Sequence, residues 1–445
     1  MADVYLDIQK SWGRRTKASW LSSLGAGLIV TLCPCWLITN WIALEYYGGS
    51  LRLTAQAALK QGIVEFAAQH APQPTFRASI GYLTWVTVQA LLYNYLPGPL
   101  SYGQMTPAGN LLKYTTNGLL AWTVTHALYG ATSLVGILDP AIIARNWEAL
   151  LVTVNVYGII LALFAQIKAY VAPSHPLDRK FTGSMIFDYF CGIELNPRIG
   201  DRWDFKLFYN GRPGIIAWTL IDLSWMAYQY QTFGFVTKSM LLVTFFHFLY
   251  VLDFFYNEDW YLRTIDITHD HFGFNLAWGD TAFLPNLYTL QVQYLGRYPV
   301  HLTTPSAFLI LAIGLSGYTL FRSCNHQKDL VRSTNGTATI WGKPAEYIRC
   351  TYSTTDGKTH QSLLITSGWW GFSRHANYLA DLMLSGAMCA TCGFTHFLPW
   401  SYFFFMGTLL LHRLRRDEKR CAMKYGKFWS LYTQKVQYKL LPGVW

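Results

Sequence analysis

Long stretches without a formal charge recur along the 445-residue chain, and they constrain its fold more than any other feature. A helix needs about 20 apolar residues to cross a hydrocarbon layer roughly 30 Å thick. With the single exception of Asp222, no formal charge falls inside the eight stretches that precede the last one: residues 20–44, 80–97, 117–138, 149–167, 213–237, 239–251, 281–296 and 298–321. This pattern predicts an all-α polytopic membrane protein.

The final uncharged stretch, residues 382–411, is too long for one upright crossing. Its 30 residues would form a helix about 45 Å long at 1.5 Å per residue. Gly393 and Pro399 offer a break, because proline interrupts the hydrogen bonds of a helix interior and glycine is a poor helix former. We therefore expect two helices here and about ten membrane helices overall.

Basic residues gather before the first uncharged stretch and in the connections after the fourth and the eighth. After residue 411 there are nine basic residues and two acidic ones. Basic connections face the cytosol in most membrane proteins, so an even number of crossings with cytosolic N- and C-termini is predicted. The net charge of +11 is then a signal of topology, aided by anionic membrane lipids, and not of nucleic-acid binding.

The densest group of ionisable residues near apolar sequence lies at residues 249–280, "LYVLDFFYNEDWYLRTIDITHDHFGFNLAWGD". Ionisable groups at membrane depth are costly and often mark a site, although helix ends and internal ion pairs are the alternative. His269 and His271 would point about 200° apart on a helix, which does not suit shared metal ligation. Cys389 and Cys392 resemble half of a zinc site without a second pair, so no metal is predicted.

A second group of polar residues lies in the basic connection after residue 321. "NHQKDLVR" places Lys328 and Arg332 at i and i+4, as two neighbouring cations on one helix face that would suit a phosphate. "SGWWGFSRHANY" adds the indole of Trp370, the amide of Asn377 and the phenol of Tyr378. With these we expect one nucleotide pocket that also includes residues of the last helix, Arg413, Arg416, Asp417 and Tyr425. The usual Gly-x-Gly-x-x-Gly fingerprint is absent from the sequence.

Alternating residues in "TATIWGKPAEYIRCTYSTTDGKT", residues 337–359, predict a small surface β-hairpin. The pair Asp356-Gly357 is the expected turn.

Three motifs identify the chain as similar to a known family. "CGIELNPRIG" (191–200), "DFKLFYNGRPGIIAWTL" (204–220) and "LLHRLRRDEKRCAMKYG" (410–426) resemble the signature regions of the membrane sterol reductases, which include Δ14 and Δ24(28) enzymes and a domain of lamin B receptor. Further runs, such as "NHQKDL" and the ending "LLPG", resemble the branch that reduces the C7=C8 double bond. The resemblance implies a segment 1–19 followed by one reductase domain, 20–445, with the cofactor pocket in 322–445.

The resemblance also implies a function and its site residues. It implies an endoplasmic-reticulum enzyme of sterol biosynthesis that uses NADPH to reduce the C7=C8 bond of 5,7-diene sterols. At residue 365 this chain has isoleucine where the family has leucine. Arg413 and Asp417, four residues apart, could form an ion pair across one helix turn. Matched by motif, the cofactor-binding positions are Lys328, Arg332, Ile365, Trp370, Asn377, Tyr378, Arg413, Asp417, Cys421, Lys424, Tyr425 and Tyr432.

Reduction of an isolated ring alkene also needs a proton, because the alkene is a poor hydride acceptor. A buried carboxyl group, or a tyrosine helped by a cationic neighbour, can donate one. The candidate catalytic residues are Tyr250, Glu258, Asp266 and His269. Aromatic neighbours would stabilise a carbocation and exclude water, and the sterol would enter sideways from the bilayer.

Other functions remain open on the sequence. Δ14 sterol reduction is the nearest alternative, because the double-bond position depends on family likeness alone. The C-terminal pattern also resembles isoprenylcysteine-type membrane methyltransferases, which bind S-adenosylmethionine, although the paired Lys328 and Arg332 favour the 2′-phosphate of NADPH. A non-catalytic sterol-binding scaffold is a third alternative, and association with other sterol-pathway membrane enzymes is a further expectation.

Overall fold

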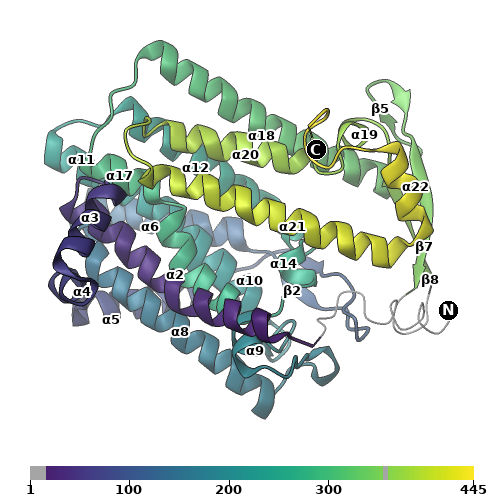
Figure 1. The fold of residues 1–445 in the computed structure, drawn as a ribbon, viewed down its shortest axis with the longest axis horizontal. Coiled ribbons are helices and arrows are strands. Elements are labelled where there is room, and N and C mark those ends of the chain that lie inside the picture. Colours follow the sequence, from purple (N-terminus) through teal and green to yellow (C-terminus); the bar gives the residue numbers. More distant parts are fainter. Residues whose placement is uncertain (1–16, 354–358, 445) are drawn as a thin grey trace. The chain divides into compact units, whose positions relative to one another are not determined.

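The computed structural model describes residues 17–353 and 359–444, and most of them form α-helices (Figure 1). The all-α prediction is therefore confirmed. The chain divides into two compact units. The C-terminal unit consists of the described residues of Thr303–Ala390 and Trp400–Trp445. The N-terminal unit consists of the described residues of Arg15–Leu302 and Thr391–Pro399. The single reductase domain at 20–445 stays a prediction.

The N-terminal unit is a bundle of long helices joined by short helical turns and small two-stranded sheets. Its helices are α2 (Trp20–Tyr46), α3 (Leu51–Gln61), α4 (Ile63–His70), α5 (Phe76–Tyr95), α6 (Gly118–Leu134), α7 (Ile142–Arg145), α8 (Trp147–Val171), α9 (Met185–Cys191), α10 (Phe205–Tyr209), α11 (Ala217–Phe233), α12 (Lys238–Tyr256), α13 (Glu258–Tyr261), α14 (Ile265–Thr268), α15 (Phe274–Trp278), α16 (Leu284–Leu287) and α17 (Leu290–Arg297). A 3₁₀ turn forms at Pro176–Asp178 and π-helical turns form at Asn210–Ile216 and Gly279–Phe283. Its strands pair antiparallel, β1 (Leu100–Tyr102) with β2 (Lys113–Thr115) and β3 (Arg198–Ile199) with β4 (Trp203–Asp204).

Within the described residues, four helices are long and apolar enough to cross a membrane: α2, α8 and α12 of the N-terminal unit and α18 (Thr304–Ser333) of the C-terminal unit. Apolar side chains that face outward are typical of lipid-facing helices. On α2 the side chains of Trp20, Leu21, Leu24 and Leu32 are exposed. These helices agree with a membrane-embedded protein.

The uncharged stretch at residues 281–296 differs from the prediction of one continuous helix. It begins inside the π-helical turn at Gly279–Phe283 and continues as α16 and α17, with a break at Tyr288 and Thr289. The Gln293 side chain donates to the backbone oxygen of Asn286 at 2.7 Å and to Thr289 Oγ1 at 2.9 Å. Irregular backbone at membrane depth is tolerated where it is buried in protein and its polar groups find partners, which is the case here.

The signature segment at residues 191–200 meets the charged segment at residues 249–280 through glycine. A Cβ atom at Gly192 would lie 2.3 Å from the carbonyl carbon of Phe272, and one at Gly273 would lie 2.1 Å from the nitrogen of Gly192. The backbone amide of Phe272 donates a hydrogen bond to the backbone oxygen of Glu194 at 3.0 Å. Because no side chain fits between these backbones, residues 191–200 lie directly against the segment that carries the candidate acids.

The C-terminal unit combines three long helices with a β-hairpin. Its elements are α18, β5 (Thr339–Ile340), β6 (Lys343–Pro344), β7 (Tyr347–Ser353), β8 (Thr359–Ile365), α19 (Trp369–Phe372), α20 (Ala376–Ala390), α21 (Ser401–Tyr425) and α22 (Lys427–Lys435). Helix α20 packs against both α18 and α21. The antiparallel pairing of β7 with β8 confirms the predicted hairpin, while its expected turn at Asp356-Gly357 lies outside the described residues.

The predicted break in the last uncharged stretch is confirmed. Helix α20 ends at Ala390, and α21 begins at Ser401 after a 3₁₀ turn at Leu398–Trp400 that contains Pro399. Residues 391–399 between them belong to the N-terminal unit.

Candidate functional site

The two cations predicted on one helix face both lie in the last turns of α18. The Lys328 ammonium group lies 4.4 Å from the centre of the Trp370 ring, and the Trp370 indole donates to the Cys324 oxygen at 2.8 Å. Arg332 is exposed at the end of the same helix. The indole is thus fixed by α18 and in turn supports the lysine through a cation–π contact.

The turn that carries Trp370 needs a glycine at residue 368. Gly368 has φ +62°, and a Cβ atom there would lie 2.5 Å from Gln327 Oε1. This oxygen accepts a hydrogen bond from the Trp369 amide at 3.0 Å. The glycine of "SGWW" therefore lets α19 dock closely on α18.

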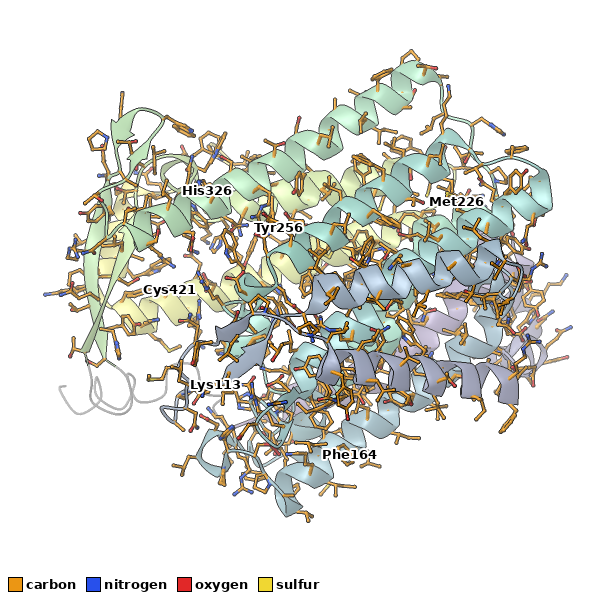
Figure 2. All side chains as sticks on the ribbon, turned by 180° about the vertical axis from the view of Figure 1, so that it is seen from behind. Lys113, Phe164, Met226, Tyr256, His326 and Cys421 are labelled. Atoms are coloured by element: carbon orange, nitrogen blue, oxygen red, sulfur yellow. The ribbon has the colours of Figure 1, made fainter. Side chains whose placement is uncertain are left out.

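Asp417 on α21 lies among cations. Its carboxylate forms an ion pair with Arg420 at 2.6 Å, three residues later, whereas the sequence suggested Arg413 as its partner. Burial alone would raise the pKa of Asp417, but the charges of Arg420, Lys328 and His375 lower it below the ordinary value. Asp417 therefore stays ionised at neutral pH and can accept hydrogen bonds from a ligand. Figure 2 marks His326 on α18 and Cys421 on α21, the helices that carry most of these charges.

An aromatic surface continues from α21 onto the hairpin. The Lys424 ammonium group lies 3.9 Å from the centre of the Tyr352 ring and 5.3 Å from that of Tyr425. Burial, reinforced by the charge of Arg420, lowers the pKa of Lys424 to about 8. Tyr352 on β7 was missed by the sequence analysis; its place in the alternating hairpin pattern was the available signal.

The remaining predicted cofactor residues lie in the same unit. Ile365 ends β8 and packs in a core cluster with Trp370. Cys421, Tyr425 and Tyr432 share a second cluster with Cys350 of the hairpin. The Tyr432 hydroxyl donates to the Trp370 oxygen at 3.5 Å. These contacts join the end of α18, the hairpin, α21 and α22 into one surface that combines cations with aromatic rings.

Asn377 and Tyr378 begin helix α20. The Tyr378 ring stacks on His375, with ring centres 5.0 Å apart. Asn377 Oδ1 is buried and has no hydrogen-bond partner within residues 17–353 and 359–444. Arg413 lies one turn before Asp417 on α21. The roles of these residues in cofactor binding stay predictions.

In the N-terminal unit, the candidate acid Glu258 belongs to a fully buried ion pair. One of its carboxylate oxygens accepts a hydrogen bond from Arg212 at 2.6 Å, and the other accepts one from the Gly118 amide at 2.8 Å. Arg212 also donates to Asn117 Oδ1 at 2.8 Å. This network joins α13, the π-helical turn at Asn210–Ile216 and the start of α6.

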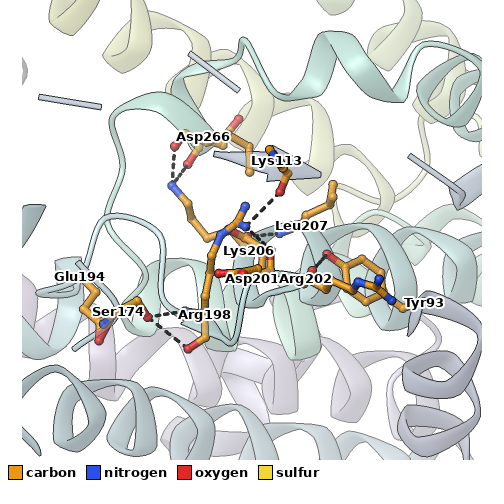
Figure 3. Close-up of polar contacts among 12 residues, drawn as sticks. Tyr93, Lys113, Ser174, Glu194, Arg198, Asp201, Arg202, Lys206, Leu207 and Asp266 are labelled. Carbon is orange, nitrogen blue, oxygen red and sulfur yellow. Dashed lines mark hydrogen bonds and ion pairs between the residues drawn. The ribbon is translucent and has the colours of Figure 1, made fainter. Parts of the chain in front are cut away.

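A buried lysine holds the segment that carries Asp266 and His269. Lys206 donates to the backbone oxygens of Asp266, Ile267 and Asp270 at 2.7 to 2.8 Å, and Figure 3 shows its ammonium group at this segment. Burial lowers the pKa of Lys206 to about 8, although the charges of nearby aspartates raise it. Helix α10 begins beside it with Asp204 as the N-cap.

The side chains of the acid candidates Asp266 and His269 are only partly buried. His269 Nδ1 lies 3.3 Å from Asp270 Oδ1. In the described part of the chain, no group of three or more histidine, cysteine or acidic side chains is arranged to hold a metal ion.

Tyr250 on α12 packs on the core that surrounds Trp218, with ring centres 5.3 Å apart. Lys206 and Arg212, which the sequence analysis did not assign to the site, hold the candidate segments in place; their position inside the second motif was the available signal.

Comparison with known proteins shows the family to which the chain belongs. The family model of the ergosterol biosynthesis ERG4/ERG24 family matches residues 31–445. A 7-dehydrocholesterol reductase of Xenopus laevis is 47% identical over 97% of this chain and 94% of its own length, and one of Danio rerio is 46% identical over 97% and 93%. A Delta(14)-sterol reductase of Methylotuvimicrobium alcaliphilum is 38% identical over 96% and 95%. The chain therefore belongs to the ergosterol biosynthesis ERG4/ERG24 family.

Proposed function

We propose that this protein is a 7-dehydrocholesterol reductase, which reduces the C7=C8 double bond of 5,7-diene sterols with NADPH. The observation that carries the proposal is the stacking of Lys328 on Trp370 beside the ionised Asp417, in a chain 46–47% identical over nearly its full length to proteins of that name.

The C-terminal unit is the proposed binding site for the cofactor. Lys328, Arg332 and Lys424 are cations that would bind phosphate groups of NADPH, and Lys424 rests on the ring of Tyr352. Trp370 and Tyr425 offer aromatic faces for the nicotinamide or adenine rings. NADPH supplies the hydride when bound, and the cationic side chains would fix its position.

The N-terminal unit is the proposed source of the proton. Both carboxylate oxygens of Glu258 already accept hydrogen bonds, one from Arg212 and one from the Gly118 amide, so the protein itself occupies this group and Glu258 is the least suited of the four candidates. Tyr250 has a hydroxyl and lies among aromatic rings. Its surroundings would exclude water and stabilise positive charge on the sterol ring.

The membrane arrangement completes the proposal. We infer about ten membrane helices in the endoplasmic reticulum, with both termini in the cytosol and the sterol entering from the bilayer. The distribution of basic residues and four long apolar helices support this arrangement. Labelling of single cysteines placed at each end of the chain, in sealed microsomes, tests the orientation.

The decisive experiment is expression in a yeast strain that accumulates 5,7-diene sterols, followed by identification of the sterols. Loss of the C7=C8 bond is the expected result. Δ14 reduction is the second candidate, because a Delta(14)-sterol reductase is also a full-length relative. A second strain that accumulates sterols with a C14=C15 bond tests this alternative. Removal of that bond, with retention of the 5,7-diene in the first strain, would replace the first proposal with the second, and unchanged sterols in both strains would indicate a scaffold.

The cofactor is tested separately with purified protein. NADPH should raise the unfolding temperature more than NADH, because the cationic side chains favour the additional phosphate. Protection by S-adenosylmethionine instead would indicate methyl transfer.

A further inference from the structure

Helices α11 and α12 are joined by a carboxylate–histidine pair that the proposed cofactor and acid residues do not include. His247 Nδ1 lies 3.1 Å from both carboxylate oxygens of Asp222. Both side chains are fully buried, with no exposed surface. Asp222 is also the one formal charge inside its otherwise uncharged stretch. A buried charge at such a position is costly and often functional.

The pair leaves one side of the histidine without a protein partner. Among the described residues, neither His247 Nε2 nor the indole nitrogen of Trp218 has a hydrogen-bond partner, and both atoms are buried. The two rings are in edge contact, with centres 5.0 Å apart. A buried polar atom without a partner costs stability, so each of these two nitrogens is available to a water molecule or to a proton-exchanging group.

The Trp218 ring connects the pair to a candidate acid. Trp218 packs against Tyr250 and Tyr288 as well as His247, and the ring centres of both tyrosines lie 5.3 Å from that of Trp218. His247 and Tyr250 are three residues apart on α12, a spacing that places them on the same helix face. Asp222 fixes Nδ1 as the donor toward the carboxylate, which leaves Nε2 to exchange a proton.

We propose that Asp222 and His247 form a buried proton relay that recharges Tyr250 after each reduction. The inference rests on the proposed reductase function. In the step, hydride adds to one alkene carbon and the Tyr250 hydroxyl proton adds to the other, which leaves a phenolate. His247, held by the Asp222 carboxylate through Nδ1, passes a proton from Nε2 to the phenolate directly or through one water molecule. A solvent proton then restores the histidine, so one proton and one hydride are consumed in each cycle.

The relay predicts a kinetic pattern that a structural pair would not give. In H247Q the first sterol is reduced with the proton already on Tyr250, so the single-turnover rate should stay within about threefold of wild type. Steady-state kcat should fall about 100-fold, in the range of acid–base catalysis. Rapid-mixing measurement of NADPH oxidation should therefore show a burst of one equivalent followed by slow turnover, with the KM for sterol lowered in proportion to kcat so that kcat/KM is unchanged.

A histidine on α6 provides the matched control. His126 also contacts α11, through Thr219 Oγ1 at 2.9 Å, but both of its ring nitrogens have protein partners. H126Q should show no burst and nearly wild-type rates in both phases. D222N is the second relay variant: its amide keeps the size of the carboxylate but cannot balance the histidine charge, so it should show the same burst.

Each other outcome overturns the relay. Equal losses of the single-turnover and steady-state rates, or no loss in either, would make the pair a structural contact, and so would failure of both H247Q and D222N to fold. If Y250F keeps wild-type turnover, the relay is wrong while the reductase function stands. If the wild-type protein oxidises no NADPH with a 5,7-diene sterol, the proposed function itself fails.

Discussion

The charged residues of the C-terminal unit and those of the N-terminal unit are used differently. In the C-terminal unit, Lys328 and Lys424 lie over aromatic rings at the rim of a helix and hairpin surface. In the N-terminal unit, Lys206 and Arg212 are fully buried and bonded to carbonyl oxygens and a carboxylate. The first arrangement suits recognition of an external anion, and the second holds the scaffold on which the acid candidates sit.

The largest effect is expected from breaking the buried pair of the N-terminal unit. R212M leaves the Glu258 carboxylate buried without its cation, which should cost about 3–5 kcal/mol of stability. Thermal unfolding in detergent measures this loss of stability. R145Q is the control, because the Arg145–Asp139 pair is 50% and 40% exposed and should contribute at most about 1 kcal/mol. A stable, inactive R212M protein would instead assign Arg212 to the reaction.

Removal of the lysine that binds three carbonyl oxygens should have the next largest effect. K206M leaves three backbone acceptors unsatisfied and should cost about 3 kcal/mol, with loss of sterol reduction because the segment with Asp266 and His269 loosens. Exposed Lys60 on α3 gives the control, K60M. Hydrogen exchange should localise the loosening to residues 265–271; unchanged exchange there would contradict the positioning role.

In the C-terminal unit the same kind of substitution should change cofactor affinity and leave stability nearly unaltered. K328M removes one charge-assisted contact to phosphate, worth about 1.5–3 kcal/mol, so the Kd for NADPH should rise roughly 10- to 100-fold. Calorimetry or fluorescence titration measures it, with exposed Lys343 on β6 changed to methionine as the control. Equal Kd values for K328M and K343M would remove Lys328 from the pocket.

The smallest effect is a pH dependence of cofactor binding. Lys424 has a pKa of about 8, and a bound phosphate would raise it, so the complex holds more protons than the free protein above that pH. NADPH affinity should therefore fall between pH 8 and 9, by at most about tenfold per pH unit. Burial also lowers the pKa of Lys328 to about 8. K424R stays charged and should therefore reduce the slope, and K424R combined with K328R should remove it. A slope that persists in the double variant would show that another group titrates.

Much of the C-terminal site could be predicted from sequence because its signals are local. Lys328 and Arg332 are four residues apart on one predicted helix, and α18 carries both. The hairpin was predicted from alternation in residues 337–359, and its paired strands lie at residues 347–353 and 359–365. The break before α21 followed from Gly393 and Pro399. The motifs at 325–330 and 410–426 added the family. The ion pair of Asp417 with Arg420 was missed, since several cations lie within reach on α21 and packing selects one.

The sequence alone determined that the chain is helical, lies in a membrane and carries cations and aromatic residues together in its C-terminal part. Uncharged stretches, helical spacing and short motifs are all properties of residues that are neighbours in the sequence, so they can be read without the fold. The tertiary structure decided which charges of the N-terminal unit are available for chemistry. Glu258 meets Arg212, Lys206 meets three carbonyl oxygens and Asp222 meets His247 through contacts between distant segments. Burial makes each of these pairings strong, and no local pattern of residues specifies the partner.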